Sequence, residues 1–242
     1  MVVFPRRKLV VLMLFIALFM VSLTVSKEDE SAVFSGEITK VIVVDAGHGL
    51  PDGGAVGMTG TIESELNIKI AKLLQEELGK KGYTVIMTRE DDKTIAEGDK
   101  SISGRKKEDM HKRLDIINSS SADMVVSIHM NKFTQSQYRG AQVIYSGNFE
   151  ESKVLASSIQ KRLHLIPENQ SKRTEAKAPK GIFLLKNAQI PAVIVECGFL
   201  SNYDEEKLLN TDKYQKELTY AILGGIEDYY ERIGRDEGIR NR

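Results

Sequence analysis

The sequence predicts an α/β sandwich, in which a mainly parallel sheet of about six strands is flanked by helices. Two observations predict it. Short apolar runs rich in β-branched residues show no polar alternation, which is typical of strands buried on both faces. These runs alternate along the chain with longer segments whose apolar residues recur at helical spacing. Such alternation is the pattern of parallel strands joined by helical crossovers.

Charged or glycine-containing segments separate these apolar runs and define the elements. The predicted strands are 41–44, 83–88, 124–128, 141–145, 181–185 and 192–195. The predicted helices are 61–78, 108–119, 152–165, a short one from Ser201 or Asn202, and a long one from Thr211 whose apolar stripe reaches Ile233. The segments 90–107 and 167–180 are charged and lack apolar periodicity, so we expect surface loops there.

The amino-terminal residues predict export. Arg6, Arg7 and Lys8 precede an apolar run over 9–25, and acidic residues follow it. Basic residues before such a run keep the amino terminus in the cytoplasm and send the following chain outside. The run is intermediate between a signal-peptide core and a membrane span, which needs about 17–25 residues. We therefore expect 1–26 to be a signal peptide or membrane anchor, and the protein to lie outside the cytoplasmic membrane.

The remaining chain suits one catalytic domain. With 242 residues it is long enough for a full core, and we expect a spacer over 27–39, the domain over 40–235 and a polar tail over 236–242. The 34 basic and 34 acidic residues balance, and no basic block suggests nucleic acid as a partner. The single cysteine, Cys197, excludes an internal disulfide and a cysteine-cluster metal site. A metal would need histidine and carboxylate ligands.

Three predicted strands end in residues that bind metals or transfer protons. His48 follows the first strand, His129 the third and Glu196 the last. Because the carboxyl ends of parallel strands share one edge, where ligands bind, these side chains should lie together. Each has a plainer explanation by itself: a strand-end histidine usually forms a hydrogen bond, and a glutamate can pair with a lysine. Their coincidence at one edge favours a functional site.

Helix geometry adds a carboxylate to this edge. At about 100° per residue, Glu63 lies on the same face as the apolar Leu66 and Ile70, whereas Glu65 points about 200° away from it. Glu63 is therefore predicted to face the sheet and Glu65 the solvent.

The residue types at this edge suit zinc hydrolysis. His48, His129 and Glu63 form a ligand set typical of zinc with an open fourth position. Glu196 can take a proton from the metal-bound water and return it to a leaving amine. Asp45 is a candidate to orient His48 from behind, although a local turn hydrogen bond explains it equally well.

The other candidates are weaker. Asn131 and the basic-loop residue Arg173 are named as candidate substrate contacts, and a solvated loop explains Arg173 about as well. His111 and His164 lie on predicted helices among basic residues, which favours surface roles. Cys197 is predicted to be a small packing residue.

Four separated motifs carry a family resemblance. They are DAGHG at 45–49, ESELN at 63–67, SIHMN at 127–131 and ECGFLSN at 196–202. In this order they resemble the zinc N-acetylmuramoyl-L-alanine amidases of the amidase-3 family, over about residues 40–233. Ala46 and Leu50 stand where relatives often carry proline and glycine, and neither supplies ligand chemistry.

This resemblance implies one zinc ion held by His48, Glu63 and His129, with Glu196 catalytic. The implied reaction is hydrolysis of the amide that joins the lactyl group of N-acetylmuramic acid to L-alanine of the stem peptide. Peptidoglycan is then the substrate, the membrane is a partner through the amino-terminal segment, and an accessory protein is a further candidate partner. The short single-domain form is similar to sporulation and germination amidases that prepare muramic lactam in the spore cortex.

Two other functions stay open at this point. A zinc exopeptidase of similar architecture would cleave peptides instead of the sugar–peptide amide. A non-catalytic wall-binding protein could be built on an inactive amidase fold, although the presence of all three ligands and Glu196 argues against it.

Overall fold

A six-stranded sheet forms the centre of the fold. The computed structural model describes residues 40–98 and 101–240, and the predicted anchor (1–26) and spacer (27–39) lie outside them. The strand order is β2-β1-β3-β6-β4-β5. The strands are β1 (Val41–Ala46), β2 (Thr84–Met87), β3 (Met124–Asn131), β4 (Gln142–Tyr145), β5 (Ala176–Lys177) and β6 (Ala192–Phe199).

The sheet is mainly parallel, as predicted. β1 pairs in parallel with β2 and β3, and β3 pairs in parallel with β6. β4 runs antiparallel to β6, and β5 runs parallel to β4. Because β4 is reversed, it begins with Gln142 at the edge where the parallel strands end, and Gln142 is the register partner of Glu196.

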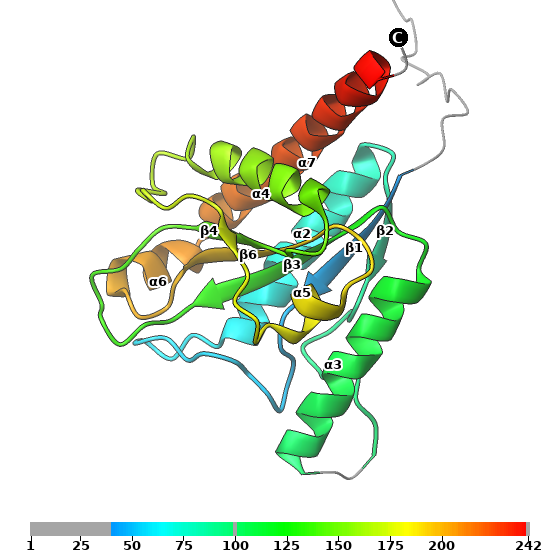
Figure 1. Ribbon diagram of the computed structural model, residues 1–242. Coiled ribbons are helices and arrows are strands. Elements are labelled where there is room, and N and C mark those ends of the chain that lie inside the picture. The colour runs from blue at the N-terminus through cyan, green and yellow to red at the C-terminus, as the bar shows by residue number, and fades with distance from the viewer. Residues whose placement is uncertain (1–39, 99–100, 241–242) are drawn as a thin grey trace, which may run out of the picture. The chain divides into compact units, whose positions relative to one another are not determined.

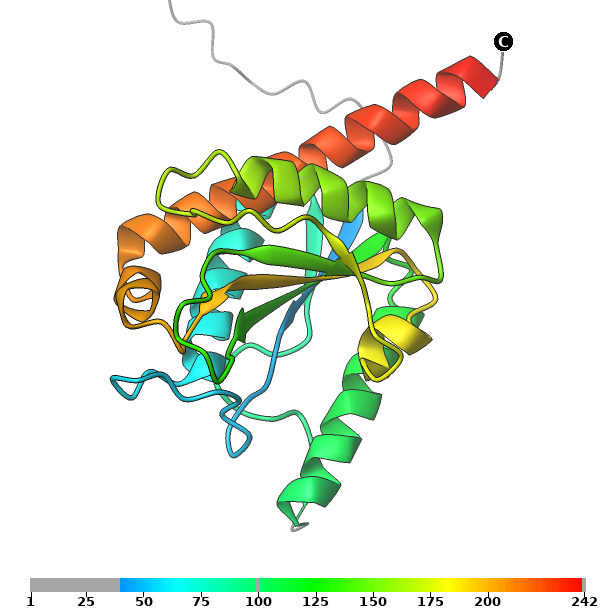
Figure 2. The same cartoon turned by 60° about the vertical axis from the view of Figure 1, so that its left-hand side comes forward.

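Helices cover both faces of this sheet (Figures 1 and 2). Val43 belongs to an apolar cluster with residues of α3 and α5, whereas Ile42 and Val44 belong to the cluster with residues of α2, α4 and α7. This alternation places two apolar cores on a sheet whose central strands are buried on both sides. The helices are α2 (Glu63–Lys80), α3 (Ile102–Ser119), α4 (Glu150–Leu163), α5 (Phe183–Asn187), α6 (Tyr203–Leu209) and α7 (Asp212–Arg240).

Two predictions about segments are wrong: the strand at 181–185, and the loop over the whole of 167–180, which contains a strand. The run 181–185 was predicted as a strand, but α5 begins at Phe183 and buries Leu184 and Leu185 against the α3 side of the sheet. A short apolar run does not distinguish a strand from a buried helical turn, and here packing decides. The sixth strand is β5, inside the predicted loop 167–180.

Both predicted surface loops are thus shorter than expected. In the segment 90–107, α3 begins at Ile102, where Ser101 caps it by accepting a hydrogen bond from Gly104 N. At the end of the chain, α7 continues to Arg240, so the predicted polar tail is helical up to that residue.

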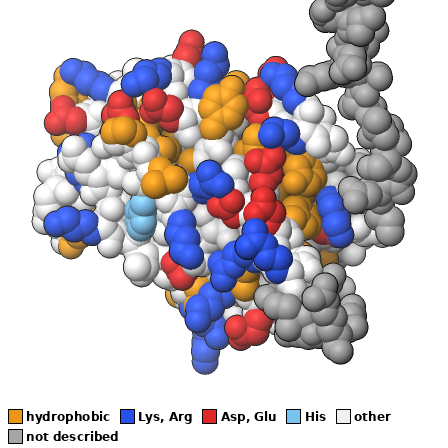
Figure 3. Space-filling view, turned by 90° about the horizontal axis from the view of Figure 1, so that it is seen from above, with side chains coloured by type: hydrophobic (Ala, Val, Ile, Leu, Met, Phe, Trp, Pro, Cys, Tyr) orange, Lys and Arg blue, Asp and Glu red, His pale blue; other side chains and the backbone are white. Residues whose placement is uncertain are grey.

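The described surface carries charges of both signs. Figure 3 shows Lys and Arg side chains intermixed with Asp and Glu on the face seen from above in Figure 1. Some oppositely charged side chains form ion pairs, such as Arg162 of α4 and Asp228 of α7, whose Nη2 and Oδ1 atoms lie 2.6 Å apart. Among the described residues, no helix has the length and apolar character needed to cross a membrane.

A buried polar network ties the end of β1 to α3. The carboxylate of Asp45 accepts hydrogen bonds from Thr88 Oγ1 (2.6 Å), Arg113 Nη1 (2.7 Å) and Ser127 Oγ. Arg113 also donates through Nε to Asp109 Oδ2, at 2.6 Å. Buried charges are tolerated when they are paired and hydrogen bonded, as both are here. The network therefore fixes α3 against the sheet edge.

These partners control the ionisation of Asp45. Burial by itself raises the pKa of this carboxyl, but the Arg113 guanidinium and the hydroxyls of Ser127 and Thr88 outweigh burial and lower the pKa to about 2.

We expect Asp45→Asn to lower the free energy of unfolding at neutral pH by about 1–3 kcal/mol, because Arg113 loses one of its two buried carboxylate partners and keeps only Asp109. Since the folded-state pKa lies below the unfolded value of about 3.9, the stabilisation from ionised Asp45 is complete above that pH. It is lost as the pH falls through the folded-state pKa of about 2. The substitution should therefore flatten the acid dependence of stability.

Urea unfolding followed by circular dichroism, between about pH 5 and pH 2, measures this dependence. Asp115→Asn, on the exposed side of α3, is the matched control and should keep the wild-type slope. An unchanged slope in Asp45→Asn would show that the ion pair does not govern acid stability.

Candidate metal centre and active site

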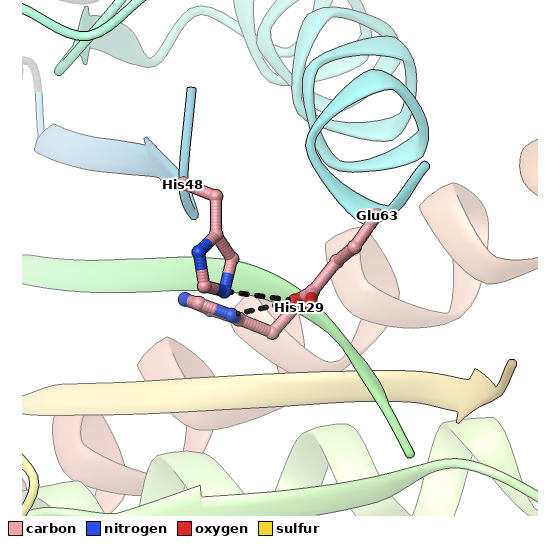
Figure 4. A group of neighbouring side chains, drawn as sticks. All are labelled: His48, Glu63 and His129. Carbon is pink, nitrogen blue, oxygen red and sulfur yellow. Dashed lines mark hydrogen bonds and ion pairs between the residues drawn. The ribbon is translucent and has the colours of Figure 1, made fainter. Parts of the chain in front are cut away.

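Three side chains from separate elements converge at the carboxyl edge of the sheet (Figure 4). His48 follows β1, Glu63 opens α2 and His129 lies in β3. Glu63 Oε1 is 3.3 Å from His48 Nε2 and 3.0 Å from His129 Nδ1. One ligand atom from each residue lies within 4.8 Å of the others. The structure thus brings together the three residues that the sequence named.

The spacing and chemistry of these atoms fit zinc. Ligands at about 2.0–2.1 Å from a tetrahedral zinc ion lie about 3.3 Å from one another. The 3.3 Å from Glu63 Oε1 to His48 Nε2 equals that value, and the 3.0 Å to His129 Nδ1 is slightly shorter. Two imidazoles and one carboxylate also leave the fourth position open, as catalytic zinc sites require.

Two glycines allow the ligands to approach the backbone. A Cβ on Gly47 would collide with the imidazole ring of His129. A Cβ on Gly54 would lie 2.5 Å from Glu63 Oε2 and 2.7 Å from the ring of His48, and Gly54 has a φ of +70°. The glycine-rich character of this loop therefore has a steric cause at these two positions.

Glu63 is held as an ionised carboxylate. Its side chain is buried, and Oε2 accepts a hydrogen bond from Ala55 N at 2.8 Å. Burial by itself raises the pKa of Glu63, but the hydrogen bonds from His129 and His48 outweigh burial and hold the pKa well below its usual range. Glu65 is exposed, so the predicted helix phase is confirmed.

His48 is positioned through its backbone as well as its ring. Its φ of +60° lies in the left-handed region, which is uncommon for a residue with a side chain. Arg113 Nη2 donates to the carbonyl oxygen of His48 and holds this conformation. Asp45, a candidate either to orient His48 or to form a local turn hydrogen bond, instead accepts a hydrogen bond from Arg113 Nη1.

Asp52 orients the His48 ring, and the sequence did not single it out. His48 Nδ1 lies 3.2 Å from Asp52 Oδ2, which leaves Nε2 facing Glu63. Lys106 Nζ from α3 lies 2.9 Å from the same carboxylate oxygen. A carboxylate behind a ligand histidine fixes its tautomer and orientation. Only the spacing of four residues from His48, within an irregular loop, hinted at this contact.

Glu196 lies beside the three residues on β6, as the register partner of His129. Its Oε2 is buried and has no hydrogen-bond partner in the described residues. Burial raises the pKa of Glu196, and the nearby His129 opposes this only in part. A carboxyl with a raised pKa and a free oxygen suits proton transfer.

A cavity of about 240 Å³ adjoins Glu196 and both histidines. It lies between the sheet edge, α3 and the segment that leads into α5. Its apolar wall is formed by Met110, Ile182, Leu184 and Ile194. The cavity thus combines an apolar wall with charged side chains, among them Lys106, Asp109 and Arg113.

The two candidate substrate contacts lie on the side of β6 and β4. Asn131 ends β3 and is the register partner of Phe199, the last residue of β6. Arg173 Nη1 lies 3.2 Å from Gln142 Oε1, at the start of β4.

Two neighbouring carboxylates of α6 hold two different segments near the site. Glu205 accepts hydrogen bonds from Gly140 N (2.6 Å) and Phe199 N (2.8 Å). Glu206 accepts from Thr59 Oγ1 at 2.7 Å and from Thr61 N at 3.2 Å, in the loop that leads to Glu63.

The remaining singled-out residues have structural roles. Cys197 is buried, as predicted, and burial raises the pKa of its thiol. His111 packs edge to face on Phe183, and His164 contacts the carbonyl oxygen of Arg173.

Comparisons with known proteins show the family of this chain. The family model described as N-acetylmuramoyl-L-alanine amidase matches residues 42–228. The chain is 40% identical over 196 residues to the germination-specific N-acetylmuramoyl-L-alanine amidase of Bacillus subtilis, covering 81% of each chain.

Two solved structures share the fold. The CwlD amidase from Clostridioides difficile, solved in complex with the GerS lipoprotein, is similar with a TM-score of 0.77 at 40% identity, over 80% of this chain and 99% of that one. An N-acetylmuramoyl-L-alanine amidase from Clostridium difficile 630 gives a TM-score of 0.69 at 29% identity, over 80% and 97% of the two chains. The His-Glu-His cluster, the fold and these matches together show that the protein belongs to the amidase-3 family of N-acetylmuramoyl-L-alanine amidases.

Proposed function

We propose that His48, Glu63 and His129 hold one zinc ion and that Glu196 is the catalytic acid–base in hydrolysis of the amide between N-acetylmuramic acid and L-alanine. The observation that carries this proposal is the convergence of three ligand atoms within 4.8 Å of one another, beside Glu196. Zinc, when bound, supplies a water of lowered pKa and polarises the scissile carbonyl.

Side chains of the protein orient the metal ligands and transfer the proton. Asp52 keeps His48 Nε2 directed at the centre, and the anionic Glu63 balances part of the metal charge. Glu196 takes the proton of the attacking water and delivers it to the amide nitrogen, so that L-alanine leaves as an amine. Burial raises the pKa of Glu196, which strengthens its carboxylate as a proton acceptor.

Family membership favours the amidase over the two other functions considered. A zinc exopeptidase would release amino acids from peptides, and a wall-binding protein would leave the wall intact. The amidase releases stem peptides with free L-alanine amino termini and leaves the glycan uncut.

We expect Glu63→Ala to lose both zinc and amide cleavage, because the carboxylate is buried and central to the ligand set. Glu65→Ala is the matched control, two residues away on the exposed face, and should keep both. Zinc content by atomic absorption and cleavage of defined muropeptides measure the two effects. Comparable zinc loss in the two variants would remove Glu63 from the ligand set.

We expect Glu196→Gln to bind zinc nearly as well as the wild type and to lose about 10²–10⁴ in rate. The amide keeps the size of the carboxyl but cannot accept the proton of the water at neutral pH. Zinc content and muropeptide cleavage, with and without added zinc, are compared with His129→Ala, which should lose the metal. Zinc missing from Glu196→Gln would make Glu196 a ligand, and full activity would exclude it from the mechanism.

We also propose that the enzyme acts outside the cytoplasmic membrane, in maturation of the spore cortex. Its likeness to the germination-specific enzyme of Bacillus subtilis supports this role. The complex of the Clostridioides difficile relative with a lipoprotein supports an accessory protein at the membrane as a partner. A signal peptide or anchor over 1–26 would place the enzyme there.

The cortex role predicts that spores of a strain lacking this gene contain no muramic lactam, because the stem peptide must leave before the lactam ring closes. Reintroducing the wild-type gene should restore the lactam, whereas the Glu196→Gln gene should not. Muropeptide analysis of purified cortex measures the muramic lactam content of each strain. A host that forms no spores, or lactam that persists in the deletion strain, would refute the role while leaving the amidase activity untouched.

A further inference from the structure

Arg173 lies on a platform of three aromatic rings beside the active site. Its guanidinium carbon is 5.0 Å from the ring centre of Phe199, 5.4 Å from Tyr138 and 5.7 Å from Phe133. Phe133 packs edge to face on Phe199 at 5.1 Å and on Tyr138 at 5.2 Å, so the platform is itself packed. Gln142 Oε1 accepts from Arg173 Nη1 and fixes the guanidinium further.

The positive charge of Arg173 is not neutralised by a direct ion pair within the described part of the chain. Glu205 is a nearby carboxylate, but its two oxygens already accept hydrogen bonds from Gly140 N and Phe199 N. Aromatic faces attract a guanidinium without removing its hydrogen-bond donors. Arg173 is thus held in place with donors available for an anion.

The strand order relates this platform to the proposed metal ligands and to Glu196. The proposed metal ligands His48 and His129 belong to β1 and β3, Glu196 lies on the next strand, β6, and Gln142 begins the strand after it, β4. The scissile carbonyl must be at the metal, and the leaving nitrogen must be within reach of Glu196. A stem peptide that continues from that nitrogen in the same direction would cross β4, the next strand, toward Arg173.

We propose that Arg173 binds a carboxylate of the stem peptide near the bond that is cleaved. One strand spacing of about 4.8 Å, plus the reach of a side chain, corresponds to about two or three extended residues beyond the scissile amide. A second residue that is a glutamate joined through its side-chain carboxyl leaves its α-carboxylate free at this distance. A planar guanidinium suits a carboxylate, because it can donate two parallel hydrogen bonds.

This inference rests on the proposed roles of zinc and Glu196 for the direction of the substrate. Its test uses the zinc-loaded protein and two N-acetylmuramoyl tripeptides, which differ only in a free carboxylate or a carboxamide on the second residue. We expect wild-type kcat/KM to be about ten- to a hundredfold higher for the carboxylate, the range for hydrogen bonds to charged groups.

Arg173→Gln should lose this preference by slowing the carboxylate substrate alone. Arg173→Lys keeps the charge but not the planar fork, and should retain part of the preference. Lys172→Gln is the matched control, since Lys172 is the exposed neighbour in the same loop, and it should keep the wild-type preference.

Binding separates this proposal from the proposed reaction. The same tripeptides are titrated calorimetrically into Glu196→Gln and into Glu196→Gln combined with Arg173→Gln. Tighter binding of the carboxylate compound by Glu196→Gln, but not by the double variant, would support the Arg173 site. Failure of the wild type to cleave either compound would refute the proposed reaction and leave the Arg173 site standing. Equal affinity for both compounds in Glu196→Gln, or an equal loss for both on changing Arg173, would overturn the proposal.

Discussion

Asp45 and Arg113 form a buried ion pair at the end of β1, and the same guanidinium holds the carbonyl oxygen of His48. The proposed metal site depends on this pair, because His48 adopts a left-handed backbone conformation that its own residue type disfavours. α3 supplies Arg113, so the packing of a helix on the sheet sets the position of a ligand in a loop. Loss of Arg113 would leave the buried Asp45 without a cation, whereas loss of Asp45 would leave Arg113 paired with Asp109.

The sequence was sufficient to predict the residues whose position follows from a periodic element. His129 and Glu196 lie on strands, and Glu63 lies in the first turn of a helix with a clear apolar face, so period and topology place all three. The wall that buries Glu196 and the contacts of Asp45 were not predictable in this way. They depend on α3 and α5, which approach the edge from distant parts of the chain.

The wrong segment and the contacts that the sequence missed have the same origin, because they depend on tertiary packing and not on a periodic element. The run 181–185 is apolar enough for either a strand or a buried helical turn, and only the space left beside α3 decides for the helix. Asp52 lies in an irregular loop, where no period relates sequence distance to direction, so its contact with His48 could not be derived. The platform under Arg173 joins Phe133, Tyr138 and Phe199, and their meeting requires the tertiary fold.

The two carboxylates of α6 have a consequence for how this enzyme can vary. Glu205 holds the backbone at Gly140 and Phe199, next to the aromatic rings, while Glu206 holds the loop that ends at Glu63. A single helical turn therefore holds both the loop before the proposed ligand Glu63 and the backbone beside the rings under Arg173. Because both segments depend on one short helix, a displacement of α6 would move them together.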